Sequence, residues 1–105
     1  KSYFAVVNGI LKEPQGIISS YLAENIMHKV YSTDDPEKGK LAKTEYEVIK
    51  TSKHYSLLKI NLLTGRKNQI RVHLADQGNP VAGDKKYGDN IRKIKRLALH
   101  SASLT

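Results

Sequence analysis

Residues 41–63, LAKTEYEVIKTSKHYSLLKINLL, carry a long and regular alternation of apolar and polar side chains. In the first half, Tyr46 and Val48 alternate with charged residues, and in the second half Leu58 and Ile60 alternate with polar ones. A period of two is typical of a β-strand that buries one face. The intervening TSKH suits a hairpin connection. The segment therefore predicts two strands joined by a hairpin.

The rest of the chain predicts further strands and few helices. KSYFAVVNGI, MHKVYS and RLALHSASL are rich in aromatic and β-branched residues or alternate in polarity, which favours strands. SSYLAEN is expected to form a short helical turn, because Ser19 or Ser20 can cap it and Glu24 follows. The predicted class is α+β, a mostly antiparallel mixed sheet with few helices.

A helix is predicted within TGRKNQIRVHLADQ, with Thr64 as its N-terminal cap and Gly78 at its end. Its expected first turn holds Arg66 and Lys67 and no acid, although the peptide dipoles already place positive charge there. Arg71 shares a face with Lys67, and no acid at helical spacing relieves them. Three interpretations remain open: a phosphate meets the first turn, Arg71 meets a carboxylate from elsewhere, or the side chains extend into water.

The charge balance favours an anionic partner. The formal net charge is +8 and the isoelectric point is about 9.7. Residues 64–105 hold nine Lys and Arg against three acids, whereas residues 1–63 hold nine against seven. A basic surface of this kind is most often a nucleic-acid footprint, with a solubilising surface as the alternative.

Several classes of site are excluded or not expected. The chain has no Cys, which excludes disulfides and thiolate metal sites. The four His residues show no metal-ligand spacing, so no metal is expected. No apolar run approaches the roughly 18 residues of a membrane span. A cytoplasmic location is the corresponding expectation. The chain opens with KSYFAVV and no initiator Met, so we expect a fragment of a longer protein.

The stretch TGRKNQIRVHLADQGNPVAGDKKYG, followed by RLALHSASL, closely resembles the C-terminal part of the RluA-type pseudouridine synthases. The opening KSYFAVVNG resembles the family's second motif, in which Lys-x-Tyr begins a strand. Asn68 stands where the family commonly has His. The residues that match the main motif are Gly65, Arg66, Gln69, Ile70, Arg71, Val72, His73, Gly78, Pro80, Gly83, Asp84, Tyr87 and Gly88.

The resemblance implies that residues 1–105 are a partial catalytic domain, the C-terminal half of the pseudouridine synthase fold. The family's first motif, with Arg-Leu-Asp at its centre, carries the catalytic Asp, and these residues contain no such triplet. The implied activity is the isomerisation of uridine to pseudouridine in structured RNA, ribosomal or transfer RNA, without metal or organic cofactor. The chain alone is expected to be inactive. The alternatives are a non-catalytic RNA-binding module and a structural half-domain that self-associates.

The resemblance also implies roles for individual residues. Arg71 and Tyr3 are the expected catalytic residues, with Arg71 pairing with the absent Asp and having no acid partner within its own chain. Leu97 and Leu99 would floor the uracil pocket, although ordinary core packing remains open for both, and Tyr3 is alternatively a half-buried strand residue. Asp84 is expected to shape a turn. The expected RNA contacts are Arg66, Lys67, Asn68, Gln69, Lys85 and Lys86.

Overall fold

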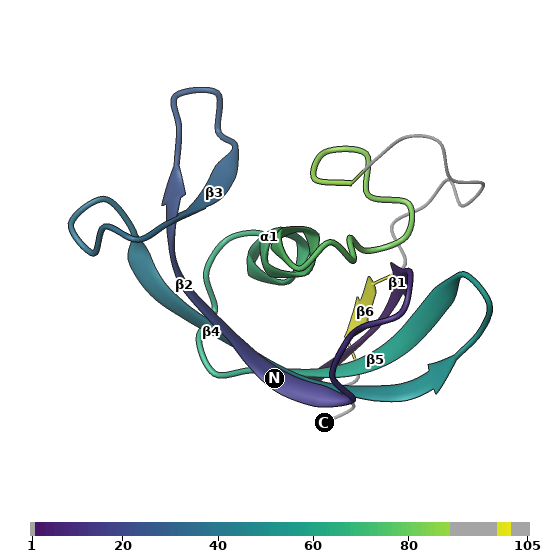
Figure 1. The fold of residues 1–105 in the computed structure, drawn as a ribbon. Helices are drawn as coiled ribbons and strands as arrows, with labels where there is room; N and C mark the ends of the chain where they lie inside the picture. Colours follow the sequence, from purple (N-terminus) through teal and green to yellow (C-terminus); the bar gives the residue numbers. More distant parts are fainter. Residues whose placement is uncertain (1, 89–98, 102–105) are drawn as a thin grey trace.

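The computed structural model describes residues 2–88 and 99–101 (Figure 1). Within these ranges the chain forms six strands and one helix. No helix in the described part is long and apolar enough to cross a membrane. The elements are β1 (Ser2–Asn8), β2 (Gln15–Glu24), β3 (Val30–Thr33), β4 (Lys40–Thr51), β5 (Tyr55–Leu62), α1 (Gln69–Asp76) and β6 (Leu99–Ser101).

The strands form one sheet in the order β3-β2-β4-β5-β1-β6. Every pairing among these described strands is antiparallel. The predicted hairpin is confirmed: β4 pairs with β5 from Thr44↔Leu62 to Thr51↔Ser56, with an irregularity between Val48 and Lys50. The predicted α+β class, with a mostly antiparallel sheet and few helices, is therefore confirmed.

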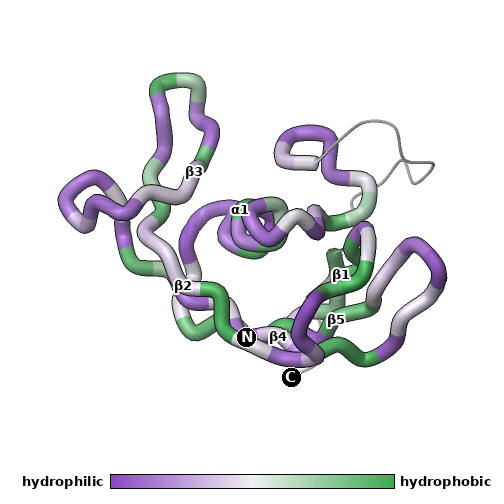
Figure 2. The backbone as a smooth tube through the Cα atoms, viewed as in Figure 1, coloured by the Kyte–Doolittle hydropathy of each residue, from purple (hydrophilic) through white to green (hydrophobic). Residues whose placement is uncertain are grey.

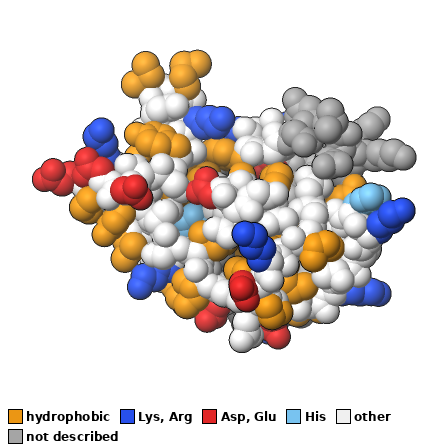
Figure 3. Space-filling view, in the orientation of Figure 1, with side chains coloured by type: hydrophobic (Ala, Val, Ile, Leu, Met, Phe, Trp, Pro, Cys, Tyr) orange, Lys and Arg blue, Asp and Glu red, His pale blue; other side chains and the backbone are white. Residues whose placement is uncertain are grey.

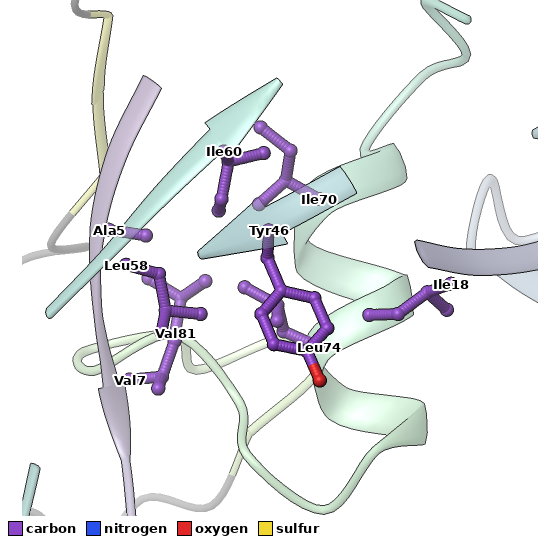
Figure 4. Close-up of a cluster of buried hydrophobic side chains, with 9 residues drawn as sticks. All are labelled: Ala5, Val7, Ile18, Tyr46, Leu58, Ile60, Ile70, Leu74 and Val81. Atoms are coloured by element: carbon purple, nitrogen blue, oxygen red, sulfur yellow. The ribbon is translucent and has the colours of Figure 1, made fainter. Parts of the chain in front are cut away.

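The sheet curves around α1, which lies in its concavity (Figure 1). The apolar positions of β4 and β5 face this helix, as the alternation requires, and Leu58 and Ile60 are fully buried. From the helix, Ile70 and Leu74 pack into the same cluster (Figure 4). Burial of this cluster fixes α1, and with it Arg71, against the concave face of the sheet.

The predicted helical turn at SSYLAEN is wrong, because residues 19–24 belong to β2 and only Asn25 lies beyond its end. Ile18 and Leu22 fall on the buried face at even spacing. The strand pairs with β4 on one side and with β3 on the other. Two rows of ladder hydrogen bonds and a buried apolar face outweigh a local capping signal.

The hairpin between β2 and β3 ends in a hydrophobic tip, which Figure 2 shows in the colour of apolar residues. Ile26 and Met27 are 93% and 79% exposed, and hydrophobic side chains project there in Figure 3. Residues 27–29 precede β3, so the predicted strand MHKVYS is confirmed only from Val30 onward.

The predicted helix exists but begins later than expected. It starts at Gln69, after Asn68 in a left-handed conformation (φ 55°), and no side chain caps it. Thr64 is not the cap, since its hydroxyl donates to Gln69 Oε1 at 2.7 Å. Arg66 and Lys67 consequently precede the helix.

The closing strand is confirmed at 99–101; Leu97 lies outside the described residues.

His73 fastens α1 to the sheet. Its side chain is fully buried, with Nε2 2.9 Å from Ser20 Oγ and Nδ1 2.8 Å from Thr44 Oγ1. Burial lowers the pKa of His73 below its ordinary value, and the charge of Asp76 only partly opposes this. The neutral imidazole is the form that the fold selects.

This burial predicts acid sensitivity. Because the pKa of His73 is lower in the folded protein, the unfolded chain binds the proton first as the pH falls below about 6.5. The His73 contribution to stability is complete above that pH and declines below it, by at most about 1.4 kcal/mol per pH unit. Thermal midpoints between pH 5 and 7.5 measure it. A His73→Gln variant should be less stable at pH 7 and have a shallower pH dependence; an unchanged pH dependence would contradict the assignment.

Candidate functional site

Arg71 and Asp84 form a bidentate ion pair. Arg71 Nε donates to Asp84 Oδ2 at 2.9 Å and Nη2 donates to Oδ1 at 2.8 Å. Two parallel hydrogen bonds between a guanidinium and a carboxylate fix geometry as well as charge. The pair joins the middle of α1 to the loop that follows it.

The loop between α1 and Asp84 is anchored to β1. Gly78 and Gly83 have φ values of 82° and 81°, which suit glycine and let the chain reverse. Asn8 N donates to Pro80 O at 2.9 Å, and Ala82 N donates to Val6 O at 2.8 Å. Hydrogen bonds to β1 therefore hold this loop in the position that places Asp84 beside Arg71.

Asp84 is buried and fully engaged. Its side chain is 0% exposed, and Oδ1 also accepts the backbone N–H groups of Lys86 at 3.0 Å and Tyr87 at 3.1 Å. Burial alone would raise the pKa of Asp84, but the hydrogen bonds from Arg71 and from the Tyr87 backbone outweigh it and hold the pKa below its ordinary value. The predicted turn role of Asp84 is confirmed. Such a carboxylate is unsuited to act as a nucleophile or base.

The aromatic ring of Tyr87 lies close to the Arg71 guanidinium of this pair. The Arg71 guanidinium is 5.1 Å from the centre of its ring, within cation–π range. Its hydroxyl accepts from Val30 N and from Asn68 Nδ2, both at 3.1 Å. Tyr87 therefore links β3, the start of α1 and the Asp84 loop, and it further restricts Arg71.

The expectation that Arg71 has no acid partner in its own chain is wrong. Asp84 lies thirteen residues further on, so it could not be found by helical spacing. Of the interpretations left open by the sequence, the structure selects a carboxylate from elsewhere. The pair uses one edge of the guanidinium only. Nη1 has no hydrogen-bond partner among the described residues, and the Arg71 side chain is 24% exposed, so a second anion can bind there.

The two cations before the helix also have partners. Lys67 Nζ lies 2.7 Å from Glu24 Oε2, and this hydrogen bond lowers the pKa of Glu24. Arg66 Nε donates to Leu41 O at 3.1 Å. Both side chains lie at the surface, where such contacts contribute little and yield easily to a stronger anion.

Gln69 is a structural residue, contrary to its predicted RNA contact. It is 2% exposed. Its Oε1 accepts from Thr64 Oγ1 and from Arg66 N, and its Nε2 donates to Lys43 O and to Thr44 Oγ1, at 2.7–3.0 Å. All its side-chain polar atoms form hydrogen bonds inside the protein.

Of the other predicted RNA contacts, Asn68 is half-buried against Tyr87, whereas Lys85 and Lys86 are exposed.

Tyr3 is partly buried and borders an open cavity of about 390 Å³. Arg66 lines the same cavity, and Arg71 is not among its lining residues. The remaining lining residues are Leu62, Leu63, Thr64 and Gly65. Leu99 packs against the hydrophobic core, as Tyr3 does, which agrees with the core-packing alternative. The structure thus brings Tyr3 together with Arg66.

Sequence reasoning counted Asp84 and Tyr87 among the motif residues but did not predict that both contact Arg71. Both stand in the GDKKYG stretch, whose acid and aromatic residue three positions apart were the available signal. In the described ranges, no three His, Asp or Glu residues lie close enough together to hold a metal ion.

Comparisons with known proteins agree on one family. Residues 1–76 match the family model described as RNA pseudouridylate synthase. YhcT of Bacillus subtilis, named as an uncharacterized RNA pseudouridine synthase, is 35% identical over 96% of this chain and 34% of its own length. Ribosomal large subunit pseudouridine synthase C of Vibrio vulnificus is 32% identical over 99% of this chain and 35% of its own.

A solved structure, human RNA Pseudouridylate Synthase Domain Containing 1, superposes with a TM-score of 0.85 at 29% identity. The match covers 96% of this chain and 46% of the human one. The chain spans about a third of the length of the curated relatives described above.

Proposed function

The chain belongs to the RNA pseudouridylate synthase family, and from this premise we propose that it is the C-terminal part of the catalytic domain of an RNA pseudouridine synthase. The full-length protein converts uridine to pseudouridine in structured RNA, ribosomal or transfer RNA. It acts in the cytoplasm and needs no metal or organic cofactor.

The reaction requires a carboxylate that these residues do not supply. The glycosidic bond between N1 of uracil and C1′ of ribose breaks, the base turns, and C5 bonds to the same C1′. The hydrogen on C5 leaves to solvent as a proton, and N1 takes up a proton, so that the product is an isomer of the substrate. The target base must first leave its stack. The attacking carboxylate comes from an Arg-Leu-Asp segment outside residues 1–105, and it must stay ionised in a partly dry pocket.

Arg71 provides the charged partner for that carboxylate. The observation that carries this proposal is the half-occupied guanidinium: Asp84 binds Nε and Nη2, whereas Nη1 has no hydrogen-bond partner in the described part of the chain, and the Arg71 side chain as a whole is 24% exposed. A second carboxylate on the remaining edge would be kept ionised and oriented. Arg71 then joins the two acids, one structural and one reactive.

Tyr3 and the last strand form the wall of the base pocket in this proposal. The cavity beside Tyr3 offers space at its ring, on which a flipped uracil can stack. In this proposal the Tyr3 hydroxyl takes part in proton transfer late in the reaction. Leu97 and Leu99 would form the apolar floor of the uracil pocket.

We assign RNA binding to the surface cations. Arg66 is the most direct one to test, because it lines the Tyr3 cavity. We expect Arg66→Ala to weaken RNA binding and to reduce the slope of log affinity against log salt by about one, the loss of one phosphate contact. Lys53→Ala removes another exposed cation, in the β4–β5 connection, and should leave the slope unchanged. Filter binding from 50 to 300 mM salt measures both; equal slopes for the two variants would contradict the assignment.

Release of tritium from RNA labelled at C5 of uridine tests the activity itself. The full-length protein should release tritium from ribosomal or transfer RNA transcripts, and residues 1–105 alone should release none. Absence of release from a full panel of both RNA classes would refute the enzyme proposal and leave an RNA-binding module. Turnover by residues 1–105 alone would show that the external carboxylate is not required.

A further inference from the structure

Asp84 makes more contacts than a turn needs. Lys86 N and Tyr87 N both bind Oδ1, and these two bonds alone would form the turn. Oδ2 is used only for Arg71 Nε among the described donors. Oδ1 of Asp84 thus serves both the loop and Arg71 Nη2, whereas Oδ2 serves only the orientation of Arg71.

The two edges of Arg71 are distinct. A guanidinium offers five N–H donors in a fixed plane, and Asp84 takes one from Nε and one from Nη2. The second Nη2 hydrogen and the two on Nη1 remain for another acceptor. Because the group is planar and rigid, holding one edge sets the direction of the other. The Tyr87 ring, 5.1 Å from Cζ, restricts the tilt of the plane.

We propose, on the premise of the function above, that Asp84 is a positioning residue for catalysis: it holds the Nε–Nη2 edge of Arg71 so that the Nη1–Nη2 edge meets the reactive carboxylate in one fixed orientation. Arg71 then offers the reactive carboxylate directed hydrogen bonds as well as charge, and a lysine cannot replace it, because an ammonium cannot present two edges to two carboxylates.

Asp84→Asn separates this role from the turn. The amide oxygen can still accept from Lys86 N and Tyr87 N, whereas the amide NH₂ meets Arg71 Nε donor against donor. In the full-length protein we expect the single-turnover rate of tritium release to fall by about 10²-fold, the usual effect of a misplaced catalytic group. RNA affinity should stay within about twofold of wild type. Asp76→Asn, the same change at an exposed acid of α1, is the matched control and should leave the rate unchanged.

A double-mutant cycle tests whether Asp84 acts through Arg71. In an Arg71→Ala background, Asp84→Asn should change the rate by no more than about twofold, because the group it positions is gone. Arg71→Lys should be nearly as slow as Arg71→Ala. Two results would assign Asp84 a purely structural role. One is an Arg71→Lys variant whose rate is close to that of wild type. The other is a cycle in which the effects of Asp84→Asn and Arg71→Ala on the rate multiply in full.

The outcomes also separate this inference from the function on which it rests. An active wild type with an unaffected Asp84→Asn variant refutes the positioning role alone. A fall in rate that only follows a fall in thermal midpoint or in RNA affinity refutes it as well. A wild type that releases no tritium from any RNA refutes the function and the positioning role together.

Discussion

Arg71→Ala in the full-length protein is expected to lower the single-turnover rate of pseudouridine formation by roughly 10²–10³-fold, the effect of removing a preorganised donor from a reacting centre. The reactive carboxylate loses its charged partner and its fixed direction. RNA affinity should fall only modestly, because the Arg71 side chain is mostly covered and the proposed phosphate contacts belong to other cations. Tritium release with enzyme in excess, beside filter binding of the same RNA, measures the two effects separately.

The same variant should also be less stable. Removal of Arg71 leaves the Asp84 carboxylate buried without its cation, which typically costs about 3 kcal/mol. The rate must therefore be compared well below the thermal midpoint of the variant. Arg66→Ala is the matched control: it should weaken RNA binding and leave the saturated rate nearly intact. If both arginine variants changed rate and affinity alike, the division of roles between them would be wrong.

Gln69→Leu should destabilise the fold by about 3 kcal/mol without a specific effect on RNA binding. Leucine fills similar space but leaves Arg66 N and the Thr64 hydroxyl without their acceptor, and buried unpaired polar groups cost about 1–3 kcal/mol each. Urea unfolding of wild type and variant measures the change.

Gln77→Leu provides the matched control at the C-terminal cap of the same helix, where the side chain is exposed, and it should alter stability by less than about 0.5 kcal/mol. A Gln69→Leu variant that kept its stability and lost RNA affinity would restore Gln69 as an RNA contact.

The elements predicted correctly are those whose patterns are local. The alternation in 41–63 predicts β4 and β5 because each strand buries one face, and the apolar spacing around Ile70 and Leu74 predicts α1. The start of α1 could not be predicted from Thr64, because the Thr64 hydroxyl is used by Gln69, a buried side chain that ties the loop to β4.

The errors arise where distant segments meet. SSYLAEN has local helix signals, but two neighbouring strands provide ladder partners that no local pattern contains. The pairing of Arg71 with Asp84 depends on the reversal at Gly78 and Gly83, so it becomes visible only in three dimensions. The family resemblance identified Arg71 from its motif, whereas its partner and the Tyr87 ring required the fold.

The position of Arg71 between two acids is the central claim, and a crystal structure of the full-length protein tests it most directly. We predict that the Asp of an Arg-Leu-Asp segment lies about 3 Å from Nη1 or Nη2 of Arg71, while Asp84 keeps its hydrogen bonds to Nε and Nη2. A structure in which that Asp lies more than about 6 Å from the guanidinium, beyond direct ion pairing, would contradict the account.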